Sequence, residues 1–152
     1  MRTASILILA ASLIGAPAYG AELLELEGMV GVPSGGPSFL IAGIPGGGAP
    51  WVIARGEAVL DEDGLFRVKV RGLVLDPVLV PAPRGGTNPV ALFIATLVCD
   101  DVAVATIGPA PADVEGNSDI RGTISLPNSC FSALVLVRSG TGNQPWFAVT
   151  GF

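Results

Sequence analysis

The most regular alternation of apolar and polar residues lies between Trp51 and Leu75, where the chain is "WVIARGEAVLDEDGLFRVKVRGLVL". Within residues 66–71 every second side chain is apolar, and the side chains between them are basic. A period of two is typical of a β-strand with one buried and one solvated face. The run "DEDG" at residues 61–64 predicts a short turn with Gly64 in a left-handed conformation, so the segment is expected to form a β-hairpin.

The turn determines which residues of this hairpin are expected to face each other. A slip of one residue would place Ala58 opposite Arg67 and mix apolar with charged side chains, so the pattern selects one register. Its inner-face pairs are Leu60–Phe66, Ala58–Val68, Gly56–Val70 and Val52–Val74, and its outer-face pairs are Glu57–Lys69 and Val59–Arg67. Alternation continued back to the start of the segment predicts inward-facing Val52, Ala54 and Gly56, and solvent-facing Trp51, Ile53, Arg55 and Glu57.

Elsewhere, short apolar stretches alternate with clusters of Gly, Pro, Asn and Asp. The expected strands are residues 23–30, 38–44 (the weakest pattern), 91–99, a return strand from 102, 119–126, 130–138 and the closing "PWFAVTGF" from 145. About seven or eight strands at this spacing predict an all-β fold, an immunoglobulin-like or related Greek-key β-sandwich. The irregular stretches 31–50 and 76–89 are expected to be surface loops, which is where function often lies.

The N-terminal stretch "MRTASILILAASLIGAPAYGAE" combines Arg2, an apolar core over residues 6–15 and small residues before Ala21. The apolar run is shorter than the roughly 20 residues of a membrane-spanning helix, and the combination is typical of a secretory signal peptide over residues 1–20. We expect cleavage after Gly20, with cleavage after Ala18 as the alternative. The mature chain, residues 21–152, is then a single domain in the periplasm or outside the cell, without a transmembrane segment.

Cys99 and Cys130 are the two cysteines of the chain. An even count in a secreted protein favours a disulfide, and closing a loop of about 30 residues stabilises by roughly 3–4 kcal/mol in the chain-entropy model. Two reduced, buried thiols are the alternative. A metal site is disfavoured because two thiols without histidine do not complete a set of ligands.

The sequence contains no histidine, which excludes Ser-His-Asp and Cys-His catalysis and the commonest zinc, copper and iron sites. Glu57 is expected to face Lys69, and a nearby cation lowers a carboxyl pKa, whereas a glycosidase general acid needs a raised one. The acidic run 61–64 is better explained as a turn than as a calcium loop, because a strand follows it. We therefore expect no enzymatic activity, no cofactor and no bound metal.

The formal net charge of −5 disfavours nucleic acid and anionic lipid as partners, because both require a positive field. A local exception is the basic stripe formed by Arg55, Arg67, Lys69 and Arg71 on one face of the hairpin. This stripe suits an acidic ligand such as a polysaccharide or, more simply, a charged surface that keeps the sheet soluble.

The aromatic residues provide one candidate ligand platform, which consists of Trp51, Trp146, Phe147 and Arg55. A Trp on a solvated strand face can stack on a sugar ring, as in carbohydrate-binding modules. The alternative is that both Trp side chains cover the ends of the core, where Trp is often partly buried.

Residues 50–75, followed by "GTNPV", "LVC", "LPNSC" and "WFAVTG", resemble a group of small secreted bacterial β-proteins without an assigned activity. The resemblance covers residues 47–151. It implies secretion and a compact β-domain, and it assigns no catalytic or binding residue. Two functions are therefore considered: a non-enzymatic structural or interaction module with a protein or glycan partner, and a small carbohydrate- or ligand-binding module.

Overall fold

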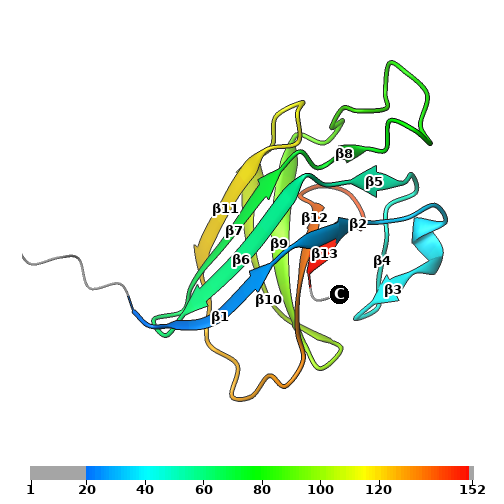
Figure 1. Ribbon diagram of the computed structural model, residues 1–152. Helices are drawn as coiled ribbons and strands as arrows, with labels where there is room; N and C mark the ends of the chain where they lie inside the picture. The colour runs from blue at the N-terminus through cyan, green and yellow to red at the C-terminus, as the bar shows by residue number, and fades with distance from the viewer. Residues whose placement is uncertain (1–19, 151–152) are drawn as a thin grey trace, which may run out of the picture.

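The computed structural model describes residues 20–150, which form strands joined by turns and loops (Figure 1). The predicted signal peptide lies outside the described residues, apart from Gly20. No helix within residues 20–150 is long and apolar enough to cross a membrane. The elements are β1 (Glu22–Glu27), β2 (Met29–Gly31), the 3₁₀ helix η1 (Gly36–Ser38), β3 (Leu40–Ile41), β4 (Ile44–Pro45), β5 (Trp51–Val52), β6 (Arg55–Asp61), β7 (Leu65–Arg71), β8 (Val74–Leu75), β9 (Leu92–Cys99), β10 (Val102–Pro111), β11 (Ser118–Thr123), β12 (Ala133–Ser139) and β13 (Trp146–Thr150).

Two antiparallel sheets form the body of the protein. Sheet A has the strand order β1-β6-β7-β11, and sheet B has the order β10-β9-β12-β13-β2. Figure 1 shows the two sheets as facing layers, with the short ladders β3–β4 and β5–β8 to the side of β2. This arrangement confirms the predicted all-β sandwich, whereas its immunoglobulin-like or Greek-key connectivity stays a prediction.

The single strand predicted over residues 23–30 is in fact two strands that belong to different sheets. β1 pairs with β6 in sheet A, and β2 pairs with β13 in sheet B. The change occurs at Gly28, whose φ of 80° turns the chain between the two ladders. One continuous segment therefore supplies an edge strand to each sheet.

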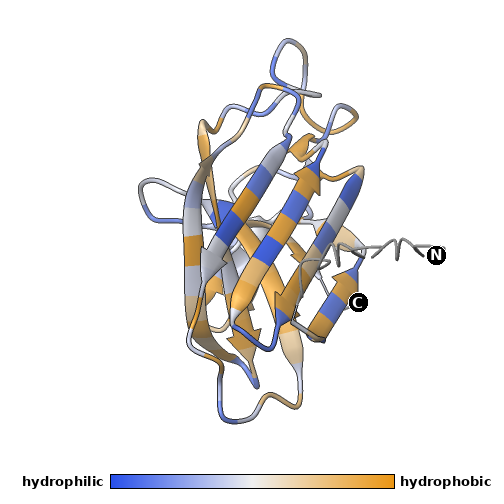
Figure 2. Cartoon of the chain, turned by 90° about the vertical axis from the view of Figure 1, so that its left-hand side faces the viewer, coloured by the Kyte–Doolittle hydropathy of each residue, from blue (hydrophilic) through white to orange (hydrophobic). Residues whose placement is uncertain are grey.

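The β6–β7 hairpin has the predicted register. Its pairs include Ala58–Val68 and Glu57–Lys69, and the β5–β8 ladder adds Val52–Val74. Gly64 closes the turn with a φ of 82°, which is the predicted left-handed conformation. Figure 2 shows alternating hydrophilic and hydrophobic bands along the strands of sheet A, which correspond to the period of two in the sequence.

The core lies between the sheets and combines Phe66, Val68 and Ile120 of sheet A with Phe93 and Leu97 of sheet B, none more than 1% exposed. Burial of each such side chain contributes about 1.5–3 kcal/mol. In β9 every residue after Leu92 is buried, so both faces of this strand are covered. Its sequence accordingly contains an apolar run rather than an alternation.

The remaining predicted strands correspond to observed ones with shifted ends. β9 and β13 fall within their predicted ranges, β10 extends to Pro111, β11 ends earlier than predicted, and β12 begins only at Ala133. The weak stretch 38–44 contains β3 and the first residue of β4, joined by a tight turn. Residues 76–89 contain no strand, as predicted, whereas 31–50 contains η1, β3 and β4 and is not an irregular loop.

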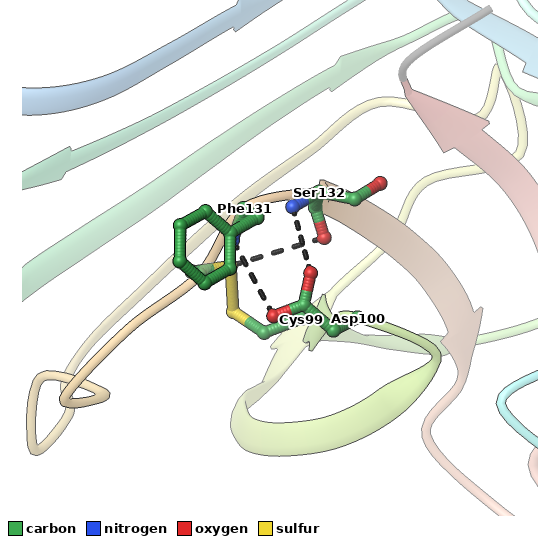
Figure 3. The surroundings of a disulfide bond; sticks show 5 residues. Cys99, Asp100, Phe131 and Ser132 are labelled. Carbon is green, nitrogen blue, oxygen red and sulfur yellow. Dashed lines mark hydrogen bonds between the residues drawn. A yellow bond between two sulfur atoms is a disulfide. The ribbon is translucent and has the colours of Figure 1, made fainter.

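The predicted disulfide between Cys99 and Cys130 is present, with the two Cα atoms 5.0 Å apart. It joins the end of β9 to the segment before β12 (Figure 3). The adjacent Asp100–Asp101 turn, with φ values of 51° and 64°, is attached to the same segment. The Asp100 carboxylate accepts the backbone N–H of Ser132 at 2.9 Å and that of Phe131 at 3.4 Å. Covalent and hydrogen-bonded contacts therefore hold this corner of sheet B together.

Candidate functional site

Trp51 is not solvent-facing, and this corrects the expectation from alternation that it lies on the solvated face with Arg55 and Glu57. Its side chain is only 5% exposed, and its ring stacks on Phe147 with centroids 4.2 Å apart. Phe147, itself 5% exposed, also makes an edge contact with Phe93 in the core. Of the predicted platform, only Arg55 has an exposed side chain. The alternative considered for the Trp residues, that they cover the core, describes the structure.

The error has a physical cause in the backbone. The predicted alternation assumed one strand from Trp51 onward, but β5 ends at Val52 and β6 begins at Arg55, and the two belong to different ladders. The break resets which side chains point inward. Val52 and Ala54 are therefore exposed rather than inward-facing, while Gly56, inside β6, is buried as predicted.

Trp146 connects β13 to the segment that carries η1 and β3. The indole Nε1 donates a hydrogen bond to the carbonyl oxygen of Phe39 at 3.3 Å, and the backbone N–H of Gly47 donates to the carbonyl oxygen of Trp146 at 2.9 Å. Although Trp146 is only 4% exposed, it lies at a hollow of the surface. One bond joins the η1–β3 segment to sheet B, and the other joins the chain just after β4 to the same residue.

That hollow, which we call the apolar groove, has a volume of about 650 Å³. It lies between β2–β13 and the η1–β3 segment, and its main lining residues are Val30, Ser38, Phe39, Leu40, Trp146 and Val149. Among residues 20–150, no charged side chain lines it. Three of its apolar side chains are open to solvent: Val30 is 48%, Phe39 47% and Leu40 66% exposed.

The pattern of the sequence does not predict the apolar groove, although residues 31–50, which supply one wall of it, are expected to form a loop where function often lies. The available signal was the pair Phe39–Leu40, which is apolar within an otherwise Gly- and Pro-rich stretch. What no pattern showed was that this pair lies beside β13, more than a hundred residues later, since that depends on the hydrogen bond from Trp146.

The outer face of sheet A carries the predicted basic stripe, and most of its cations are paired. Lys69 lies 2.9 Å from the Glu57 carboxylate, and Arg71 lies 2.8 Å from Asp119. Arg55 also approaches Glu57, at 3.4 Å. The hydrogen bond from Lys69 lowers the pKa of the Glu57 carboxyl, which agrees with the expectation that this residue is unsuited to act as a general acid.

A second hollow, the charged cleft, crosses this outer face and has a volume of about 360 Å³. Its lining residues are Glu22 and Glu25 from β1, Glu57 and Val59 from β6, Arg67 and Lys69 from β7, and Arg121 from β11. Arg67 and Arg121 face each other directly across the β7–β11 ladder. Neither has a carboxylate within 4.0 Å among residues 20–150.

Comparisons with known proteins add no relative: no family model, no curated protein and no solved structure matches the chain. The resemblance to secreted bacterial β-proteins therefore depends on its motifs alone. Within the described part of the chain, no group of three or more His, Cys, Asp or Glu side chains is arranged to hold a metal ion.

Proposed function

We propose that this protein is a non-enzymatic binding module of the periplasm or the exterior of the cell, and that it takes a small, uncharged, apolar ligand in the apolar groove. The observation that carries the proposal is the exposure of Val30, Phe39 and Leu40 around one open hollow. Ligand sites typically have volumes of about 300–1,000 Å³ and mostly apolar linings, so the groove at about 650 Å³ has a suitable size.

The protein's own hydrogen bonds hold the two walls of the groove together, which favours binding because little conformational freedom is then lost. The η1–β3 segment is held to β13 by the Trp146–Phe39 and Gly47–Trp146 hydrogen bonds. A lining without charge suits a hydrocarbon chain or ring, because a charged group buried there would have no partner. The disulfide is compatible with an oxidising compartment.

The test is a fluorescence titration with Nile red, a neutral apolar dye that the charged cleft does not attract. The intact protein is expected to bind the dye saturably, and Leu40→Ser to weaken binding by about tenfold, which corresponds to losing most of one buried Leu contact. Leu79→Ser is the matched control, because Leu79 is 60% exposed and lies outside the groove. Equal losses in the two variants, or no saturable binding, would contradict the proposal.

A second candidate is an interaction module that contacts a protein through the loop 76–89. Val78 is 87% and Leu79 60% exposed, and the Asp76 carboxylate holds both by accepting their backbone N–H groups at 2.7 and 3.2 Å. A rigid pair of exposed aliphatic side chains is a suitable anchor for a partner. A photo-crosslinking residue at position 79 should give one defined adduct in producing cells. The same residue at position 84, exposed in the same loop, should give none, and equal adducts would argue against this candidate.

The carbohydrate-binding hypothesis loses its main support, because Trp51 and Trp146 are each no more than 5% exposed. A stacking platform requires an open ring face. We therefore place the apolar groove ahead of a glycan site as the basis for function.

A further inference from the structure

The charged cleft is a second candidate site, independent of the apolar groove. Its central feature is a row of outward-facing residues that runs across all four strands of sheet A: Glu25 on β1, Val59 on β6, Arg67 on β7 and Arg121 on β11. The row therefore has an acidic end and a doubly basic end, with an uncharged residue between them.

The opposed arginines are unusual because like charges directly across a ladder destabilise a sheet. The same face contains a second such pair, Arg55 opposite Arg71, and there the repulsion is relieved. Arg55 reaches Glu57, and Arg71 reaches Asp119. Arg67 and Arg121 have no such partner within 4.0 Å in the described part of the chain. Because proteins tend to break such local rules at functional sites, this unrelieved pair marks a candidate site for an anionic group.

Two adjacent guanidinium groups match an oxyanion, because each presents several N–H donors in a planar fork. A purely anionic ligand would nevertheless meet Glu22 and Glu25, which line the same cleft. A ligand with a cationic group at its other end satisfies both ends of the row. The backbones of β1 and β7 are two strand spacings apart, about 9–10 Å, which sets the scale of the separation between the two charges.

We propose that the charged cleft binds a zwitterionic small molecule, with its oxyanion group held between Arg67 and Arg121 and its ammonium group beside Glu25. Val59, between the two ends, contacts the uncharged middle of the ligand. Because the cleft is open to solvent, each ion pair contributes weakly, and the affinity is expected in the millimolar range.

The probe is ε-aminocaproate, with caproate and hexylamine as controls of the same length that carry one charge each. Titrations are followed by backbone amide chemical shifts at low salt, since salt screens exposed charges. We expect saturable shifts confined to β1, β6, β7 and β11, with the zwitterion binding about two- to fivefold more tightly than either control. Shifts that are absent, or spread over the whole surface, would overturn the site.

Single substitutions then separate the two ends of the cleft. Arg67→Gln and Arg121→Gln should each weaken binding of ε-aminocaproate, while Glu25→Gln should weaken binding of the zwitterion and not that of caproate. Arg84→Gln is the control for loss of a positive charge, because Arg84 is exposed in the loop 76–89 and does not line the cleft. If caproate binds the intact protein as tightly as ε-aminocaproate, the cleft is a plain anion site and the zwitterion proposal is wrong.

Discussion

The outer faces of the two sheets differ in chemistry although both are built from antiparallel strands. On sheet A, one row across the strands contains Glu25, Val59, Arg67 and Arg121. On sheet B, the row Val30–Val149–Leu136–Thr96–Thr106 contains no charge. Leu136 and Thr96 are fully buried and Val149 is 1% exposed, but Val30, at the edge, is 48% exposed.

The two outer faces differ in which of their side chains are exposed to solvent. On sheet A most outward side chains of β6 and β7 are charged, and all of these except the buried Asp61 are exposed or half-buried. On sheet B the outward side chains are buried through most of the row and become accessible at β2, where the apolar groove begins. The chemistry of each hollow follows from the face on which it lies, so the charged cleft and the apolar groove suit different ligands.

The largest expected effect comes from placing one carboxylate on either face. Leu136→Asp places a carboxylate at a fully buried position of sheet B, where the nearby Arg138 is already bonded to Thr96, and should destabilise by about 3–4 kcal/mol. Val59→Asp puts the same group among the charges of sheet A and should cost about 1 kcal/mol or less. Urea unfolding of the two variants measures the difference. Similar losses would mean that the two faces are equally solvated, contrary to the comparison.

The next effect concerns the covalent link within sheet B. The double variant Cys99→Ser/Cys130→Ser should lose roughly 3–4 kcal/mol in the chain-entropy model. The Asp100 carboxylate still accepts the N–H groups of Phe131 and Ser132, so the end of β9 and the segment before β12 should stay in contact without the disulfide. Amide hydrogen exchange is expected to accelerate more in β9 and β12 than in β6 and β7. Uniform acceleration would show that the sheets unfold as one unit.

A smaller change in stability is expected when the repulsion between Arg67 and Arg121 on sheet A is removed. Arg121→Glu converts the cross-strand pair with Arg67 from like to opposite charges and should stabilise by about 0.5 kcal/mol at low salt. Thermal unfolding at low and high salt measures it, because screening should remove the gain. Arg121→Gln is the control and should give a smaller gain. If Arg121→Glu lowered the stability, the claim that Arg67 and Arg121 repel each other in the parent protein would be wrong.

The smallest effect is the pH dependence contributed by Glu57. Because Lys69 lowers the pKa of this carboxyl in the folded protein, the unfolded chain binds the proton more readily. The pair therefore contributes stability above the ordinary pKa of 4.5, and this contribution is lost as the pH falls through the folded pKa. The contribution should be a few tenths of a kcal/mol, since the pair is exposed. Glu57→Gln should unfold with a flatter acid dependence than the parent protein, and an identical dependence would refute this role.

How far the sequence predicts the structure also differs between the sheets. The β6–β7 register followed from alternation because only one face of that hairpin is buried. In β9 both faces are covered, so the apolar run shows that a strand exists but not which side chains face the core. The burial of Trp51 could not be predicted by extending the alternation, because the break between β5 and β6 carries no Gly, Pro or Asn signal.

The basic stripe could be predicted from the sequence, whereas the charged cleft and the apolar groove could not, because they depend on contacts between distant segments. The charged side chains of Arg67 and Lys69 follow from a local pattern, so the basic stripe was visible in the sequence. Their relation to Arg121 and Glu25 required the order of the strands, and the apolar groove required the contact between Trp146 and Phe39. Long-range pairing of this kind leaves no periodic trace in a single sequence.

The segment that passes from β1 to β2 has a consequence for proteolysis and aggregation. Gly28 is exposed, and it is the point at which one chain leaves sheet A and joins sheet B. A protease that cuts there could release β1 and uncover the edge of β6, whereas β2 would stay covalently attached to the rest of the chain and paired with β13. Unpaired strand edges are templates for pairing with other chains. A single cleavage would thus expose the seven-residue strand β6 as a new, longer edge of sheet A that can pair with another chain.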